Sequence, residues 1–141
     1  MDKSFCFTIG KVTYMGYIKH KSEESMEDYL ETILILRQRK GKVRSIDIVA
    51  ELEYTKASVS VAMKGLREKN LITMDEVGYI ELTDLGLEKA ENVLERHTLL
   101  TNCLIMLGVS EKVAMEDACR MEHDISEETF EALKNHCLKK I

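Results

Sequence analysis

Residues 45–70 read SIDIVAELEYTKASVSVAMKGLREKN and decide the fold. Apolar residues repeat at helical spacing over about 45–52 and again over about 56–69, with residues 53–55 forming a turn between the two runs. Ser45 is suited to cap the first helix. A short helix, a tight turn and a second helix with small polar residues near its start predict a helix-turn-helix.

Two short runs that are typical of strands follow this motif. Residues 71–74 (LITM) and 78–82 (GYIEL) are rich in β-forming residues, and 75–78 make the turn. A hairpin directly after a helix-turn-helix is the wing of a winged-helix domain. The order of elements therefore predicts a winged helix-turn-helix.

Helical patterns lie on both sides of this domain. An amphipathic helix precedes it and ends at about Arg39. Three apolar helices follow, capped by Thr83, Ser110 and Ser126, and these most simply form a dimer interface. The predicted fold class is mainly α, with three parts: an N-terminal extension of uncertain structure (1–22), a winged helix-turn-helix domain (23–85) and an all-helical dimerisation domain (86–141).

The charge is distributed unevenly along the chain. The 141 residues carry a net charge of −5, yet residues 40–70 hold seven basic and four acidic residues, a balance of +3. Residues 71–141 hold 15 acidic and seven basic residues, a balance of −8. A basic block in an acidic chain indicates one face for phosphates and another for cations or a partner.

The start of the second helix is the candidate surface for reading DNA. Small side chains let a helix approach base edges, hydroxyls bond bases or phosphates, and lysines supply positive charge. The alternative is an ordinary solvated helix start. The candidate DNA-binding residues are Thr55, Lys56, Ala57, Ser58, Ser60 and Lys64 at the second helix, and Arg44 from the preceding helix.

A second group of residues has the chemistry of a metal site. In Cys119-x-x-Glu122-His123 the positions i, i+3 and i+4 share one helix face, so that a thiolate, a carboxylate and an imidazole can converge. The alternative is a half-buried cysteine beside a solvated Glu-His pair. Asp28 and Glu31, and separately His97, strengthen the metal interpretation, although they could equally be a solvated acidic face and a core histidine.

Other classes of protein are disfavoured. The sequence has no nucleophile elbow, no glycine-rich phosphate loop and no HExxH, so an enzyme is not expected. No apolar run approaches the length that spans a bilayer, and no signal peptide is evident, so we expect a cytoplasmic protein. Cys6, Cys103, Cys119 and Cys137 form no CxxC, and we expect reduced thiols, with Cys103 in the core.

From about Ser22 onward the chain resembles the diphtheria-toxin-repressor family of iron- and manganese-dependent regulators, and most of all its short manganese-regulator-like branch. Six segments carry the resemblance by their order and spacing: SMEDYLE (25–31), KASVS (56–60), LTDLG (82–86), RHxLL (96–100), LGV (107–109) and CRMEHDIS (119–126). It implies a homodimer that binds double-stranded operator DNA, with a metal site between the first helix and the dimerisation helices.

The resemblance also implies a ligand set. Asp28, Glu31, His97, Glu122 and His123 fall on ligand positions of the manganese branch, whereas Cys119 falls where the iron branch has cysteine. The expected cofactor is Fe(II) or Mn(II), with Co(II) or Zn(II) possible in vitro. The expected function is a metal-dependent repressor of metal-uptake genes. One alternative is a winged-helix regulator without a metal that senses redox state or a small molecule, and another is a winged helix that contacts protein.

Overall fold

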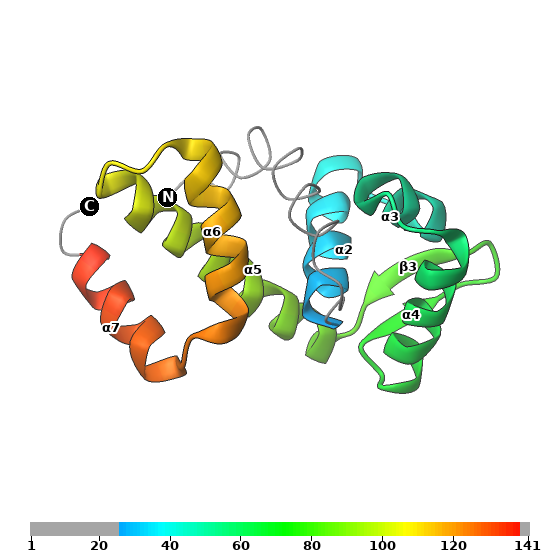
Figure 1. Ribbon diagram of the computed structural model, residues 1–141. Coiled ribbons are helices and arrows are strands. Elements are labelled where there is room, and N and C mark those ends of the chain that lie inside the picture. Colours follow the sequence, from blue (N-terminus) through cyan, green and yellow to red (C-terminus); the bar gives the residue numbers. More distant parts are fainter. Residues whose placement is uncertain (1–25, 139–141) are drawn as a thin grey trace. The chain divides into compact units, whose positions relative to one another are not determined.

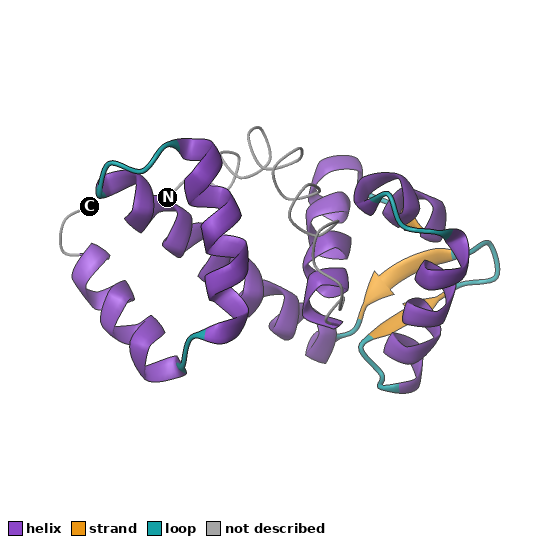
Figure 2. Cartoon of the chain, viewed as in Figure 1, coloured by secondary structure: helices purple, strands orange, loops and turns teal. Residues whose placement is uncertain are grey.

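The computed structural model describes residues 26–138, whose helices and strands are shown in Figures 1 and 2. These residues divide into two compact units, the first ending at Val93 and the second beginning at Leu94. The extension expected over 1–22 lies outside the described residues. The mainly α fold class is confirmed.

The first unit is a winged helix-turn-helix. Its elements are α2 (Met26–Lys40), β1 (Val43–Arg44), α3 (Ser45–Leu52), α4 (Lys56–Glu68), β2 (Ile72–Met74), β3 (Tyr79–Leu82) and the start of α5 (Asp84–Met106). Helices α3 and α4 are the two helices of the motif, and β2 and β3 are the wing (Figure 2). Every element that the sequence predicted here is present.

The sheet contains one strand that the sequence analysis missed. The strand order of the sheet is β1-β3-β2, and both pairings are antiparallel. Ile72 pairs with Leu82 across the hairpin, and Val43 pairs with Ile80 on the other side of β3. Strand β1 is only two residues long, which is too short for a period-two pattern to appear in the sequence.

Apolar side chains from α2, α3 and α4 form the core of this unit. Ile33, Ile48 and Leu52 are at most 1% exposed. On α4 the buried residues are Val59, Met63 and Leu66, as the helical spacing predicted, whereas Ala62 of the expected stripe is only half-buried. Burial of this stripe turns the opposite face of α4 toward solvent.

The cap of α3 differs from the prediction. Arg44 and not Ser45 is the N-cap residue, and the carboxylate of Asp47 accepts a 2.8 Å hydrogen bond from the Arg44 backbone N–H. Burial acts to raise the pKa of Asp47, but hydrogen bonds from Lys40 and from the Arg44 backbone leave this pKa below its ordinary value. An acidic residue near the start of a helix also suits the helix dipole.

The second unit is helical. It contains the rest of α5, then α6 (Glu111–Asp124) and α7 (Glu127–Leu138). Gly108 follows α5 with a φ of +101°, a conformation that glycine adopts without strain. The Ser126 hydroxyl caps α7 by accepting a hydrogen bond from the Thr129 N–H at 3.1 Å. None of the described helices is both long and apolar enough to cross a bilayer.

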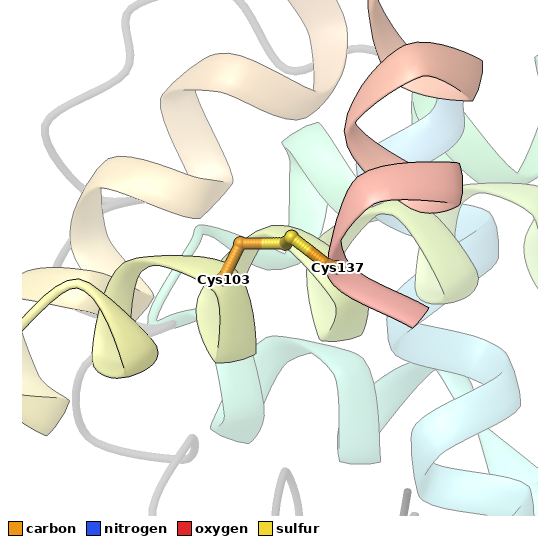
Figure 3. The surroundings of a disulfide bond; sticks show 2 residues. All are labelled: Cys103 and Cys137. Atoms are coloured by element: carbon orange, nitrogen blue, oxygen red, sulfur yellow. A yellow bond between two sulfur atoms is a disulfide. The ribbon is translucent and has the colours of Figure 1, made fainter. Parts of the chain in front are cut away.

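A disulfide joins α5 to α7 (Figure 3). Cys103 and Cys137 are 6.1 Å apart between Cα atoms, within the range that a disulfide bridges. Both lie in a buried cluster with Leu99 and Phe130, so Cys103 is in the core as expected. The expectation of reduced thiols is wrong for this pair, because packing of α7 on α5 brings together two cysteines that are 34 positions apart.

Close backbone packing fixes the start of α5 against the wing. A Cβ atom on Gly86 would lie 1.9 Å from the carbonyl oxygen of Leu71. The same carbonyl accepts a hydrogen bond from the Thr83 backbone N–H at 3.1 Å. Glycine is therefore required at residue 86 because a backbone atom occupies the space of a side chain.

We expect Gly86→Ala to lower the free energy of unfolding by about 3 kcal/mol, because the helix must move away from Leu71 to admit the methyl group. The matched control is Gly65→Ala on α4, where an added Cβ meets nothing within 4 Å. That change should leave stability equal or raise it by about 0.5–1 kcal/mol. Urea denaturation measures both variants, and equal stability of the two would contradict the packing argument.

Candidate metal centre and nucleic-acid interface

Helices α5 and α6 bring three potential metal ligands together in the second unit. His97 comes from α5, and Cys119 and Glu122 come from consecutive turns of α6. Their ligand atoms all lie within 4.8 Å of one another. The three residues are 2%, 1% and 2% exposed, so the cluster is buried.

The Glu122 carboxylate is the centre of this cluster. One oxygen lies 3.1 Å from Nδ1 of His97, and the other lies 3.1 Å from Nε2 of His123. The Cys119 sulfur lies 3.4 Å from the same His97 nitrogen. Glu122 thus lies between two imidazoles, with the thiol of Cys119 beside His97. Helical spacing puts Cys119 and Glu122 on one face of α6, and the packing of α6 on α5 adds His97.

The donor set fits a divalent transition metal. A carboxylate, two imidazoles and a thiol are the side chains that bind Fe(II), Mn(II), Co(II) and Zn(II). Burial of ionisable groups costs free energy unless opposite charges or hydrogen bonds compensate it. A half-buried cysteine beside a solvated Glu-His pair does not describe this site, because Cys119 and Glu122 are both at most 2% exposed.

The first unit holds the other two candidate ligands. Asp28 and Glu31 lie one turn apart near the start of α2 and are 1% and 0% exposed. A solvated acidic face is therefore excluded for this pair. Thr32 donates a hydrogen bond from its hydroxyl to the Asp28 carbonyl at 2.8 Å, which is local to the helix.

The exposed face of α4 carries the candidate DNA-binding residues. Thr55 caps the helix, and its hydroxyl accepts a 3.1 Å hydrogen bond from the Ser58 N–H. Within the part of the chain that the structure describes, no ion pair involves Lys56 or Lys64. All six candidates of this segment are exposed: Thr55, Lys56, Ala57, Ser58, Ser60 and Lys64.

Arg44 lies elsewhere than on the helix that the sequence analysis assigned to it. It belongs to β1, and its guanidinium lies 5.7 Å from the centre of the Tyr79 ring on β3. Lys42 lies over the same ring at 4.7 Å. These cation–π contacts put two positive charges beside the turn of the wing.

Two further residues belong to these surfaces, and sequence reasoning missed the role of the second, Arg96. Val61 on α4 is 73% exposed, and an exposed apolar side chain among small polar residues suits contact with a thymine methyl group. Arg96 contacts the end of α6 next to Glu122. The only signal for Arg96 is its position beside His97, because its contacts depend on helix packing.

Two family models match the chain. Residues 21–78 match the N-terminal DNA-binding domain of the iron-dependent repressors, and residues 83–139 match their metal-binding and dimerisation domain. Among individual proteins, the transcriptional regulator MntR of Escherichia coli is 37% identical over 111 residues, which cover 79% of this chain and 72% of that protein.

Two further relatives extend the comparison. An uncharacterised helix-turn-helix regulator of Methanocaldococcus jannaschii is 32% identical over 113 residues, covering 79% of this chain and 90% of that protein. The structure of the manganese regulator SloR superposes with a TM-score of 0.72 at 26% identity, covering 82% of this chain. The chain spans 54% of the SloR chain and 55% of the Thermoplasma acidophilum IdeR chain, which superposes with a TM-score of 0.68.

The family resemblance and the expected domain types are therefore confirmed. The chain belongs to the iron-dependent repressor family, whose members sense a metal ion, dimerise and regulate transcription by binding DNA.

Proposed function

We propose that this chain is a homodimeric cytoplasmic repressor, not an enzyme, which binds its operator when Fe(II) or Mn(II) is plentiful and so limits transcription of metal-uptake genes. The observation that carries the proposal is the buried cluster of His97, Cys119 and Glu122 in a chain that also exposes a recognition helix. The proposed ligands are Asp28, Glu31, His97, Cys119, Glu122 and His123.

The mechanism follows from the charges of these residues. The carboxylates of Asp28, Glu31 and Glu122 would repel one another in a shared site, and a divalent cation would supply the positive charge that offsets this repulsion. Glu122 and the two histidines belong to the dimerisation unit, whereas Asp28 and Glu31 belong to α2 of the DNA-binding unit. A metal ion bound by ligands of both units would restrict the two recognition helices of the dimer, one α4 from each subunit, to a spacing that fits DNA. That spacing is about 34 Å or a multiple of it.

Metal and DNA would then favour the same conformation of the dimer, so each increases the affinity for the other. The DNA side of this coupling uses α4. Ala57, Ser58 and Ser60 approach base edges, while Lys56 and Lys64 contact phosphates.

The Cys119 thiol bears on the choice of metal. Thiolate ligands favour softer ions than carboxylates do, which shifts preference from Mn(II) toward Fe(II), Co(II) or Zn(II). The manganese regulator SloR is among the similar structures, which supports Mn(II) as a candidate ion. Iron or manganese remains the proposed physiological ion.

A pair of variants tests the coupling of metal to DNA. Glu122→Gln removes the central negative charge at nearly constant shape, and we expect it to abolish the stimulation of DNA binding by metal, with a loss of at least roughly 10-fold in metal affinity. DNA binding is measured by fluorescence anisotropy with and without Mn(II), and sedimentation should show an intact dimer.

Lys64→Ala is the control for that measurement. It should weaken DNA binding to a similar degree with and without metal and reduce the salt slope by about 1.8, because each of the two subunits loses one phosphate contact, at about 0.9 per contact. Metal stimulation as strong in Glu122→Gln as in the wild type would refute the proposed site.

Cys119→Ser tests the donor set. We expect it to weaken Co(II) and Zn(II) binding more than Mn(II) binding, because the hydroxyl is a poor substitute for a thiolate toward the softer ions. Competition titrations give the three affinities, and the near-ultraviolet thiolate-to-Co(II) absorption should disappear. Equal losses for all three ions would show that the sulfur is not a ligand.

A redox-sensing regulator is the second candidate function, and the Cys103–Cys137 disulfide favours it. Closing a 34-residue loop constrains the unfolded chain, so reduction should lower the free energy of unfolding by about 4 kcal/mol. Urea denaturation with and without dithiothreitol measures this effect, and Cys103→Ser should be insensitive to the reductant.

The wild-type protein with and without dithiothreitol also distinguishes the two candidate functions. If the metal proposal holds, operator affinity at saturating metal changes little on reduction. A large loss of affinity on reduction, together with no response to metal, would replace metal sensing by redox sensing.

A further inference from the structure

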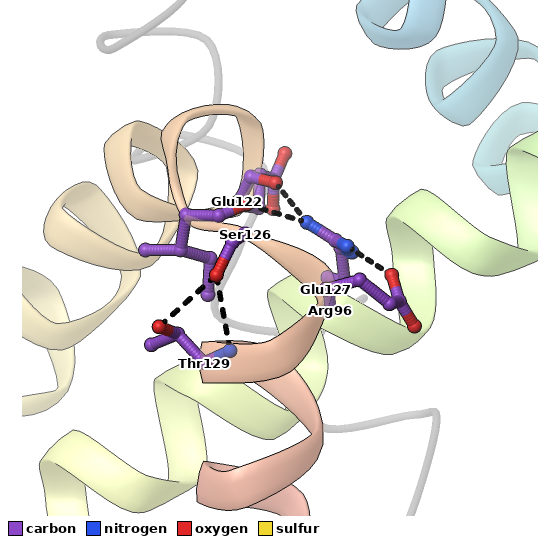
Figure 4. A network of polar contacts seen from close by, with 6 residues as sticks. Arg96, Glu122, Ser126, Glu127 and Thr129 are labelled. Atoms are coloured by element: carbon purple, nitrogen blue, oxygen red, sulfur yellow. Dashed lines mark hydrogen bonds and ion pairs between the residues drawn. The ribbon is translucent and has the colours of Figure 1, made fainter.

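Arg96 connects α5 to the end of α6 and the start of α7. Its guanidinium donates hydrogen bonds to the backbone carbonyls of Glu122 at 3.1 Å and Ile125 at 3.3 Å. It also pairs with the carboxylate of Glu127 and lies 4.9 Å from the centre of the Phe130 ring. One side chain thus contacts four residues of the α6–α7 corner, and Figure 4 shows the polar part of this network.

These contacts provide hydrogen-bond donors for carbonyl groups at the C-terminal end of α6. The last four carbonyls of a helix have no partner within the helix, and the negative end of the helix dipole attracts a cation. The planar guanidinium of arginine can donate to two carbonyls at fixed geometry, which the single ammonium group of lysine cannot do equally well. Arg96 therefore sets the path of the backbone at Glu122 and just beyond it.

The contact with Glu122 is to its backbone and not to its carboxylate. The two carboxylate oxygens face His97 and His123 at 3.1 Å each. An arginine that paired with this carboxylate would compete with a metal cation for it. The positive charge of Arg96 is instead paired with Glu127, whose side chain is 72% exposed.

The corner beyond Glu122 is also held from its other side. Ser126 accepts a hydrogen bond from the Thr129 N–H at 3.1 Å, and the two hydroxyls lie 3.2 Å apart (Figure 4). The backbone from Glu122 to the first turn of α7 is thus fixed by hydrogen bonds at both ends. His97, which follows Arg96 directly on α5, is placed by the same helix.

We propose that Arg96 is a positioning residue of the metal centre: by holding the Glu122 backbone it fixes the distance between the Glu122 carboxylate and the His97 imidazole. The inference rests on the proposed function, because it requires that these residues bind the metal. Substitution of residues that orient metal ligands without binding the metal commonly lowers metal affinity by about 10- to 100-fold.

A second ion pair joins the same two helices and supplies a matched control. Lys134 on α7 pairs with Glu95 on α5 at 2.6 Å, one position before Arg96, and contacts no proposed ligand. If Arg96 only braces the helices, Arg96→Met and Lys134→Met should both affect unfolding and leave the metal site alone. If Arg96 positions Glu122, only Arg96→Met should change the site.

The probe is Co(II), whose visible absorption reports the number and arrangement of its ligands. The full-length wild type, Arg96→Met, Arg96→Lys and Lys134→Met are titrated with Co(II), and urea denaturation of each apoprotein is recorded. We expect Arg96→Met to bind Co(II) at least roughly 10-fold more weakly with an altered spectrum. Arg96→Lys should be intermediate, and Lys134→Met should match the wild type.

The outcomes separate the two proposals. A wild-type protein that binds no Co(II) would overturn the proposed metal centre itself. If the wild type binds Co(II) and Arg96→Met gives the affinity and spectrum of Lys134→Met, the positioning role is overturned while the metal centre stands. Should Arg96→Met fail to fold, Arg96→Lys decides: a wild-type affinity and spectrum overturn the role, and a weakened, altered complex supports it.

Discussion

A carboxylate removed from water is stable only where donors or cations surround it. The Glu122 carboxylate lies 3.1 Å from one imidazole on α5 and 3.1 Å from another on α6, but neither of its buried oxygens accepts a hydrogen bond from the described residues, so that a bound cation would meet this condition. Helix α6 therefore has to pack on α5 so that the Glu122 and His97 side chains keep their separation, and neighbouring contacts stabilise this packing. One side of α6 is buried and carries Met115, Ala118 and Cys119. At the C-terminal end of this helix, Arg96 donates a hydrogen bond to the Glu122 carbonyl.

The DNA-binding unit manages its charges differently. Part of the basic block is used within the fold, because Arg39 pairs with the nearly buried Glu51 at 2.7 Å and Lys40 pairs with Asp47 at 2.6 Å. The charges toward solvent are consequently concentrated on α4 and beside the turn of the wing. A net count of charge over the segment understates how local this surface is, since ion pairs inside the domain contribute nothing to attraction at a distance.

The helices were predictable because their apolar residues repeat at 3.6-residue spacing, and Gly41 and Gly108 mark helix ends with positive φ. Residues 119, 122 and 123 could be placed on one face for the same reason. The meeting with His97 depends on packing between two helices, so only the family resemblance suggested it. Strand β1, the disulfide and the contacts of Arg96 likewise depend on residues far apart in the sequence, where local patterns carry no information.

The disulfide has a topological consequence for the second unit. It closes a covalent ring that runs from Cys103 to Cys137 and contains all of α6, including Cys119, Glu122 and His123. A protease that cuts the backbone once inside this ring would leave both fragments tied together. Such a nicked chain would travel as one species in electrophoresis until a thiol reductant separates its pieces.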